Sequence, residues 1–209
     1  MELVTTDGVF ALDGGEWEVT NNIWLVGDDR EVMVFDAAHD HAPIVEAVNG
    51  RRVTAIVLTH GHNDHINAAV ALREAVDAPI LLHEADTMLW RAVYSDHTTD
   101  GAIEPGVALK AGGHEVGVLH TPGHSPGCCC FHDIAAGVVF SGDTLFCGGP
   151  GATGRSFSDE PTILASIRQK LLALPDETIV HTGHGDSTTV GAERDAVMNR
   201  IAELGLGDS

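Results

Sequence analysis

The sequence predicts a layered α/β fold, in which short strands alternate with helices along a chain of 209 residues. Short apolar runs alternate with segments whose apolar residues recur at helical spacing. Hydrophobic residues make up 44% of the chain, which is enough for one substantial core. Polar clusters fall where the apolar runs end, and loops at strand ends on one edge of a layered fold are where sites are built.

The first half of the chain alternates regularly between the two patterns. The continuous apolar run at residues 53–58 is typical of a buried strand. Ala69, Leu72 and Val76 lie at helical spacing, and Pro79 precedes another apolar run. Strands are therefore predicted at residues 23–26, 32–35, 53–58 and 80–82, and helices at 44–48, 66–76 and 85–93.

The second half repeats this rhythm, with no segment that resembles a linker. Ser158 or Asp159 is a suitable N-cap for a helix with Pro161 in its first turn. We expect residues 1–209 to form a single domain. Strands are predicted at residues 116–119, 128–131, 138–140 and 179–181, and helices from near residue 161 and over 192–204.

The chain carries a net charge of −20, from 31 acidic and 11 basic residues. Such a surface repels phosphate backbones and offers no basic patch to a membrane, so neither nucleic acid nor a membrane is an expected partner. No apolar run approaches the roughly 20 residues of a membrane-spanning helix, and the N-terminus does not resemble a signal peptide. We expect a cytoplasmic protein, monomeric or a small homo-oligomer, that acts on a small molecule.

The four cysteines are consistent with that location. Cys128, Cys129 and Cys130 are adjacent and Cys147 stands apart, which is not the pattern of a secreted disulfide framework. Because side chains alternate along a strand, Cys129 is expected to point opposite to its two neighbours. We predict buried small side chains here in preference to a thiol site.

The segment HGHNDH at residues 60–65 points to metal binding. It places His60, His62, Asp64 and His65 between a predicted strand and a predicted helix. So many ligand-type side chains are buried together only if something satisfies them, and a metal ion does so. A polar surface loop is the alternative, and it would explain a single histidine better than this cluster. Four close ligands do not easily reach one ion, so two neighbouring ions are expected.

Three later segments offer the remaining ligands. His124 lies in TPGHSPG, Asp143 in SGD after a predicted strand, and His184 in TGHG. Each follows a glycine, which lets backbone and ligand approach closely. The two oxygens of an aspartate can bridge two ions, which in such sites lie roughly 3.5–4 Å apart and turn a shared water into a nucleophile.

These motifs, in this order over nearly the whole chain, resemble the metallo-β-lactamase superfamily. The phrases HTPGHSPG, FSGDTLF and TGHG resemble its short glyoxalase II-like members in particular. The resemblance implies a four-layer αββα sandwich, an α/β (or α+β) fold. It also implies metal ligands: His60, His62 and His124 for a first ion, Asp64, His65 and His184 for a second, and Asp143 as the bridge.

The resemblance further implies hydrolysis of a thioester by a hydroxide that bridges the two metals, with Asp64 orienting the attacking water. Asp36 matches a family aspartate that supports a metal ligand. The bridging position is a cysteine in β-lactamases of the main class, so Asp143 counts against a β-lactam substrate. Zinc is the first candidate for the metal, with iron and manganese as alternatives.

The chain departs from the larger glyoxalase II enzymes, which carry a C-terminal helical domain that helps to bind glutathione. Only 25 residues follow His184, and the basic residues of the glutathione clamp have no clear counterpart. The thiol carrier is therefore open. A composition rich in Ala, Gly, Val and Arg and poor in Lys is typical of high-GC actinobacteria, whose thiol is mycothiol.

Three rival functions fit parts of this pattern. A persulfide dioxygenase of the same fold would bind one iron through His60, His124 and Asp143. A nuclease of the superfamily is disfavoured by the net charge. A non-catalytic metal-binding module is disfavoured by the completeness of the ligand set.

The segment GGPGATGRS at residues 148–156 resembles a phosphate-binding loop with Arg155 in place of lysine. The capping signals start the next helix too late for such a loop, so a nucleotide site is disfavoured. The corresponding region of glyoxalase II enzymes contacts the thiol carrier. Gly149, Gly151 and Arg155 are therefore expected to line the substrate pocket, with Arg155 as an anion contact; a structural turn with Arg155 paired to an acid is the alternative.

The other histidines are expected to be surface or packing residues. This holds for His39, His41, His83 and His97, and a place at the border of the pocket is the alternative for each of the four. His120 is expected to support the end of its strand.

Overall fold

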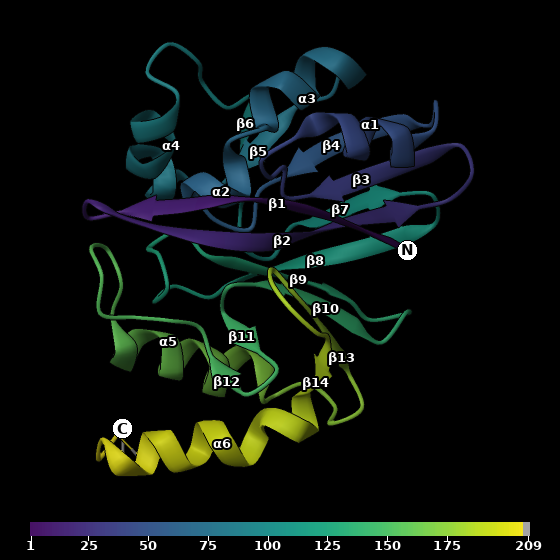
Figure 1. Ribbon diagram of the computed structural model, residues 1–209. Coiled ribbons are helices and arrows are strands. Elements are labelled where there is room, and N and C mark those ends of the chain that lie inside the picture. The colour runs from purple at the N-terminus through teal and green to yellow at the C-terminus, as the bar shows by residue number, and fades with distance from the viewer. Residues whose placement is uncertain (207–209) are drawn as a thin grey trace.

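The computed structural model describes residues 1–206, which form two six-stranded sheets packed face to face with helices on both outer faces (Figure 1). The predicted four-layer αββα architecture is confirmed. Residues 207–209, the last of the predicted domain, lie outside the described residues. Within residues 1–206, no helix has the length and apolar character needed to cross a membrane.

The first sheet is antiparallel at its N-terminal strands and parallel beyond the third. In spatial order it consists of β1 (Glu2–Leu12), β2 (Gly15–Gly27), β3 (Glu31–Phe35), β4 (Arg52–Val57), β5 (Ile80–Leu82) and β6 (Gly101–Ala102). Its outer face carries α1 (His41–Val48), α2 (Asn63–Ile66), α3 (Ala69–Val76) and α4 (Thr87–Val93), which follows a 3₁₀ turn at Glu84–Asp86.

The second sheet contains one parallel pair, β10 with β13, and is otherwise antiparallel. In spatial order it consists of β14 (Thr188–Thr189), β13 (Ile179–Thr182), β10 (Val138–Gly142), β9 (Cys129–Asp133), β8 (His114–His120) and β7 (Ala108–Ala111). Its outer face carries α5 (Glu160–Ser166), which continues as a π-helical turn (Ile167–Leu171), and α6 (Val190–Glu203). A separate two-stranded ribbon pairs β11 (Leu145–Phe146) with β12 (Gly149–Pro150).

The core has one apolar layer between the sheets and one under each set of helices. Between the sheets, Phe35 of β3 stacks on Phe140 of β10, with ring centroids 4.7 Å apart. Cys129 belongs to this middle layer, whereas Cys130 belongs to the layer under α5 and α6. Adjacent cysteines of β9 therefore point to opposite faces, as predicted, and Cys128 is buried with them.

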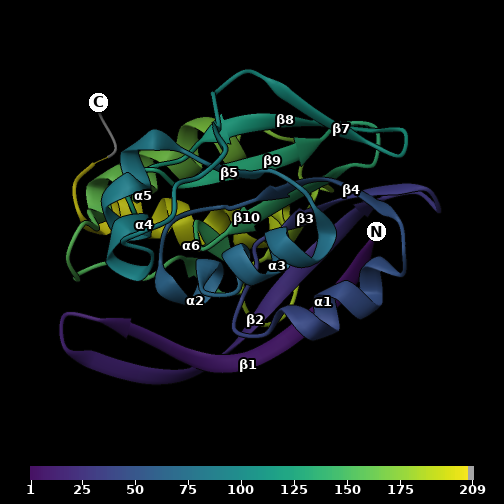
Figure 2. The ribbon, with the colours of Figure 1, turned by 90° about the horizontal axis from the view of Figure 1, so that it is seen from above.

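The main element absent from the sequence-based expectation is β1, which pairs with β2 along its whole length. It lies at the sheet edge and most of its residues are exposed or half-buried, so it lacks the apolar run of a buried strand. Asp13 and Gly14 form the turn with φ angles of 54° and 77°, the positive values that two-residue hairpin turns require. The hairpin projects beyond the other strands (Figure 2). The predicted helix at 66–76 is shorter than expected, because α2 ends at Ile66 and α3 begins at Ala69.

The polar clusters follow strands that run in the same direction within each sheet. In the first sheet, Asp36 follows β3 and His60 follows β4, and these strands are parallel. In the second sheet, Asp143 follows β10 and His184 follows β13, which are also parallel. The carboxyl ends of such strands meet at one edge, so segments far apart in the sequence converge there.

Candidate metal centre

A first group of three histidines, His60, His62 and His124, converges on one point. His60 Nε2 lies 3.0 Å from His62 Nδ1, and His62 Nδ1 lies 2.9 Å from His124 Nε2. All three side chains are buried. Three ring nitrogens that face one another at this distance form the kind of set that holds a metal ion.

A second group, Asp64, His65 and His184, lies beside the first. His65 Nε2 is 3.1 Å from His184 Nε2, which is 3.3 Å from Asp64 Oδ2. Asp143 lies between the groups: its Oδ2 is 3.5 Å from Nε2 of both His124 and His184. The seven predicted ligands are thus brought together, and Asp143 is the side chain that reaches both groups.

The buried atoms of this site suit divalent cations. Asp64 Oδ1 and Asp143 Oδ1 have no hydrogen-bond partner among the described residues, although such buried atoms are normally paired. Imidazole nitrogens and carboxylate oxygens together are a donor set that zinc, iron and manganese accept. The residues present therefore fit a pair of such ions.

The outer nitrogens of three of these histidines are held by other groups. His65 Nδ1 donates to Asp36 Oδ2 at 2.8 Å, His124 Nδ1 to the Ala152 carbonyl at 2.8 Å, and His184 Nδ1 to the Thr20 carbonyl at 2.7 Å. A proton on Nδ1 leaves the Nε2 lone pair of each ring directed into the site. The supporting place predicted for Asp36 matches this contact.

The two groups differ in charge. Burial, reinforced by neighbouring histidines, lowers the pKa of His60 and lowers that of His62 to about 3. Burial alone would lower the pKa of His65 and His184 as well, but the nearby carboxylates of Asp143 and Asp64 outweigh it. They raise the pKa of His65 well above its ordinary value and that of His184 to about 10. Negative charge is therefore concentrated on the second group.

Asp86, at the start of α4, joins the two loops that carry the first group. Its Oδ2 accepts from Gly61 N at 2.8 Å and from Ser125 Oγ at 2.6 Å, and its Oδ1 accepts from Gly127 N at 2.6 Å. Gly61 stands between two of the histidines, and Ser125 follows the third. A Cβ at Gly127 would overlap the carboxyl group of Asp86, so the loop fits only with glycine there. Nothing in the local sequence distinguishes this aspartate from the many exposed ones.

The comparisons with known proteins agree with this geometry. Residues 17–184 match the family model of the metallo-beta-lactamase superfamily. The chain belongs to this superfamily. It is 33% identical over 187 residues to hydroxyacylglutathione hydrolase GloC of Haemophilus influenzae, covering 82% of this chain and 87% of that protein.

Two solved structures share the fold closely. The crystal structure of TTHA1623 in a di-iron-bound form is 34% identical, with a TM-score of 0.75, and the match covers 84% of this chain and 93% of that one. The crystal structure of BLEG-1, a B3 metallo-beta-lactamase, is 30% identical, with a TM-score of 0.75, and the match covers 91% of this chain and 97% of that one. The metallo-β-lactamase fold of this chain is therefore accompanied by a His/Asp cluster suited to divalent metal ions.

In this metallo-β-lactamase-superfamily chain a cavity of about 360 Å³ opens onto the ligands. One part of its lining consists of four proposed ligands: Asp64, His124, Asp143 and His184. Its other walls come from the hairpin and from the segment after β10, and they are mostly apolar: Phe10, Val19, Thr20, Phe146, Ala152 and Arg155. The sequence alone gave no reason to single out Phe10 or Phe146, because the hairpin and the ribbon were not predicted.

The glycine-rich loop reaches the cavity through Arg155. The guanidinium carbon of Arg155 lies 3.8 Å from the ring centroid of Trp17 and 5.3 Å from that of Phe10, a cation–π arrangement. Gly149 and Gly151 do not line this cavity; a Cβ at Gly151 would instead overlap the Asp143 carbonyl.

The same loop does not form a phosphate-binding turn. Asp159 caps α5 by accepting from Thr162 N at 2.9 Å, so the helix begins after Arg155 and Ser156. The N-cap and the place of Pro161 in the first turn are as predicted.

The remaining histidines mostly have structural contacts. His120 Nε2 donates to the Pro126 carbonyl at 2.9 Å and its ring stacks on His83, which confirms the support expected at this strand end. His41 and His97 lie at exposed positions with weak polar contacts. His39 differs, because it is hydrogen-bonded to residues that reach the second group.

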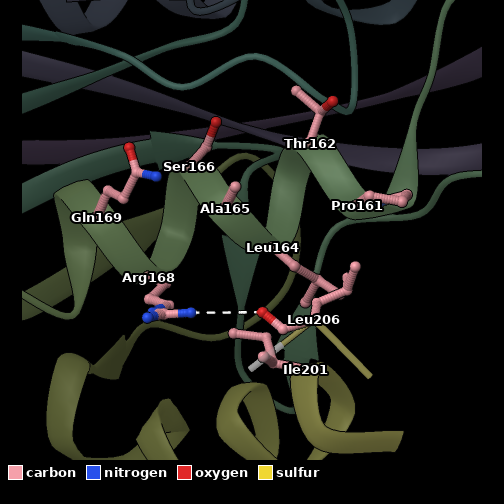
Figure 3. A pocket seen from close by; sticks show the side chains of 9 residues that line it. All are labelled: Pro161, Thr162, Leu164, Ala165, Ser166, Arg168, Gln169, Ile201 and Leu206. Carbon is pink, nitrogen blue, oxygen red and sulfur yellow. Dashed lines mark hydrogen bonds between the residues drawn. The ribbon is translucent and has the colours of Figure 1, made fainter. Parts of the chain in front are cut away.

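A separate cavity, of about 420 Å³, lies between α5 and α6 (Figure 3). Its one charged lining residue is Arg168, which donates to the Leu206 carbonyl at 3.5 Å. The lining includes no histidine, cysteine or carboxylate, so this cavity offers no metal ligand.

Proposed function

We propose that the protein is a dinuclear metal-dependent hydrolase that cleaves the thioester bond of an S-acyl conjugate of a low-molecular-weight thiol. The observation that carries the proposal is the pair of adjoining ligand groups with Asp143 between them. Likeness to a hydroxyacylglutathione hydrolase supports the thioester substrate class.

The proposed ligands are the two groups and the aspartate between them. Two divalent ions bound there would lower the pKa of a shared water and polarise the scissile carbonyl. Asp64, with one oxygen unpaired in the protein, would orient the attacking water, and Asp36 would hold His65 through its hydrogen bond. No serine or cysteine nucleophile is required. Zinc is the first candidate for both ions, with iron or manganese as alternatives.

The cavity offers a place for both ends of such a substrate. Phe10, Val19 and Phe146 form an apolar wall beside the ligands, suited to an acyl or alkyl chain. Arg155 provides positive charge in an otherwise acidic protein and would donate to an oxygen of the thiol carrier, a carboxylate in glutathione or a hydroxyl in mycothiol. Glutathione and mycothiol are the two carriers to compare.

The test combines metal analysis with a substrate panel. We expect close to two atoms of zinc, iron or manganese per chain, and hydrolysis of S-acyl glutathione or S-acyl mycothiol with far higher kcat/KM than of a β-lactam. One iron per chain, with oxygen uptake on adding a persulfide, would replace the hydrolase by a dioxygenase. A preference for the β-lactam would overturn the substrate class.

The bridging place of Asp143 has its own test. Asp143→Ala is expected to lose metal and hydrolase activity together, because one side chain would serve both ions. An Asp143→Ala protein that retained two metals and full activity would show that Asp143 is not the bridge.

A further inference from the structure

His39 is the one histidine outside the ligand set that is connected to it. It lies just beyond Asp36 in the segment after β3, with a positive φ of 58°. A Cβ at Gly8 of β1 would overlap the His39 ring, so the strand passes directly over the imidazole and holds it in place. Burial lowers the pKa of His39, which keeps the ring neutral.

The hydrogen bonds around His39 determine which ring nitrogen carries the proton and how the amide of Asn67 is oriented. The backbone N–H of His39 donates to Asn67 Oδ1, so the Nδ2 of Asn67 is the atom that faces His39 Nδ1, at 3.1 Å. Asn67 Nδ2 can only donate, so His39 Nδ1 accepts and the ring proton is on Nε2. His39 Nε2 lies 2.8 Å from Asn21 Oδ1 and donates to it.

The last bond of this series reaches a proposed metal ligand. With its Oδ1 committed to His39, Asn21 presents Nδ2 to Asp64 Oδ2 at 3.1 Å. Asn21 is completely buried, and the same Nδ2 lies 3.4 Å from His184 Nε2. If the amide were flipped, Asn21 Oδ1 would face the Asp64 carboxylate, and two acceptors would oppose each other in a buried site.

We propose that His39 and Asn67 lock the amide of Asn21 so that it positions Asp64 to bind the second metal ion. The inference rests on the proposed dinuclear function and deepens it. Asn21 donates to Asp64 Oδ2, the oxygen that lies 3.3 Å from His184 Nε2 and 3.5 Å from His65 Nε2, and so holds the carboxylate against the other two side chains of the second group. Within residues 1–206, no hydrogen bond joins the first group to His39, Asn67 or Asn21, so the effect is expected at the second ion.

Two substitutions of His39 separate the relay from general folding. The amide of glutamine lies near the place of the ring Nε2, so His39→Gln retains a donor to Asn21. The amide of asparagine lies near the place of Nδ1, so His39→Asn loses that donor while it tolerates the positive φ. His41→Asn is the matched control, because the His41 side chain is 43% exposed and its Nδ1 lies 3.9 Å from Asp40, which is not part of the relay.

The measurement is a zinc titration of each metal-free protein against a chromophoric chelator, which gives two dissociation constants. The first constant is that of the ion held by the first group, and the second constant is that of the ion held by the second group. We expect His39→Asn to weaken the second constant about tenfold, and Asn21→Ala to weaken it about 10- to 100-fold, as outer partners of metal ligands do. His39→Gln and His41→Asn should retain the wild-type constants, and the first constant should be unchanged throughout. Substituting Co²⁺ checks the assignment, since the absorption of only one ion should change.

The possible outcomes distinguish failure of the His39–Asn21 relay from failure of the proposed dinuclear hydrolase. Two zinc ions in the wild type, with an unchanged second constant in His39→Asn and Asn21→Ala, would overturn the relay and leave the dinuclear hydrolase standing. Equal weakening of both constants, with a lower melting temperature of the metal-free variants, would reduce His39 to a structural residue and overturn the relay. A wild-type protein that binds one ion per chain would overturn both proposals.

Discussion

Replacing Asp86 with asparagine should loosen the first group of histidines without touching a proposed ligand. The carboxylate of Asp86 accepts three hydrogen bonds, from Gly61 N, Ser125 Oγ and Gly127 N. Asparagine has the same shape but only one oxygen, so its NH₂ group must face either Gly61 N–H or Gly127 N–H. Ser125 can adapt in both cases, because a hydroxyl donates and accepts.

The size of the effect follows from these bonds. One buried backbone N–H of the variant loses its acceptor, which costs about 1–3 kcal/mol. The remaining bonds lose their charge assistance, at about 1 kcal/mol each. Burial raises the pKa of Asp86, so removing the charge recovers part of this cost. A net destabilisation of about 3 kcal/mol corresponds to a fall in Tm of about 6–12 °C for a chain of this size.

Thermal unfolding of the metal-free protein measures this effect, and a zinc titration shows its consequence for the site. We expect Asp86→Asn to weaken the zinc constant of the first group, because Asp86 holds the loops of His60, His62 and His124 together. Asp29→Asn, at an exposed position, is the control for loss of one negative charge. A Tm within about 1 °C of the wild type would refute the reasoning, since it is far below the cost of one unsatisfied buried N–H.

Three further outcomes are expected. Gly183→Ala should lose bound metal and hydrolase activity, because a Cβ at Gly183 would overlap Asp143 Oδ1. Gly117→Ala is the control and should retain both, because a Cβ there meets only one atom, at 3.8 Å. Metal content and hydrolase activity of the two variants test this prediction. Arg155→Ala should raise KM for an anionic thioester more than it lowers kcat, and an unchanged KM would assign Arg155 to packing. A thiol reagent at pH 8 should modify Cys147, which is exposed, and spare the three adjacent cysteines, whose pKa values burial raises; rapid reaction of all four in the native protein would contradict this.

The proposed ligands could be predicted because each is marked by its immediate neighbours. His60 to His65 form a dense cluster at a strand end, and His124, Asp143 and His184 each follow a glycine. Such short-range patterns can be recognised in the sequence alone. The parallel strands then bring the ligands that follow them to one edge of the sheets. The alternation of apolar runs and helical spacing predicted the buried strands, whereas the four-layer sandwich was what the family resemblance implied.

The supports of the site could not be predicted, because their partners lie far along the chain. Asp86 joins Gly61 to Gly127 by hydrogen bonds. Asn21 reaches Asp64 from β2, an antiparallel strand of the first sheet that lies 43 residues earlier in the chain. No spacing rule connects such pairs. The hairpin was missed for a different reason: an edge strand needs no apolar run, and the turn signal at Asp13 and Gly14 is short.

The two proposed ions therefore depend on separate parts of the fold. The first group consists of three histidines on loops that the carboxylate of Asp86 joins by hydrogen bonds. The second group is rich in carboxylate and depends on Asn21, which comes from the projecting hairpin. The contacts of Asp86 and the relay through His39 share no residue. Asp86→Asn should therefore weaken zinc binding at the first group, and His39→Asn should weaken it at the second. The double variant should show both losses of binding free energy, each of the same size as in the single variant. Non-additive losses would mean that Asp143, the side chain common to both groups, transmits the disturbance from one ion to the other.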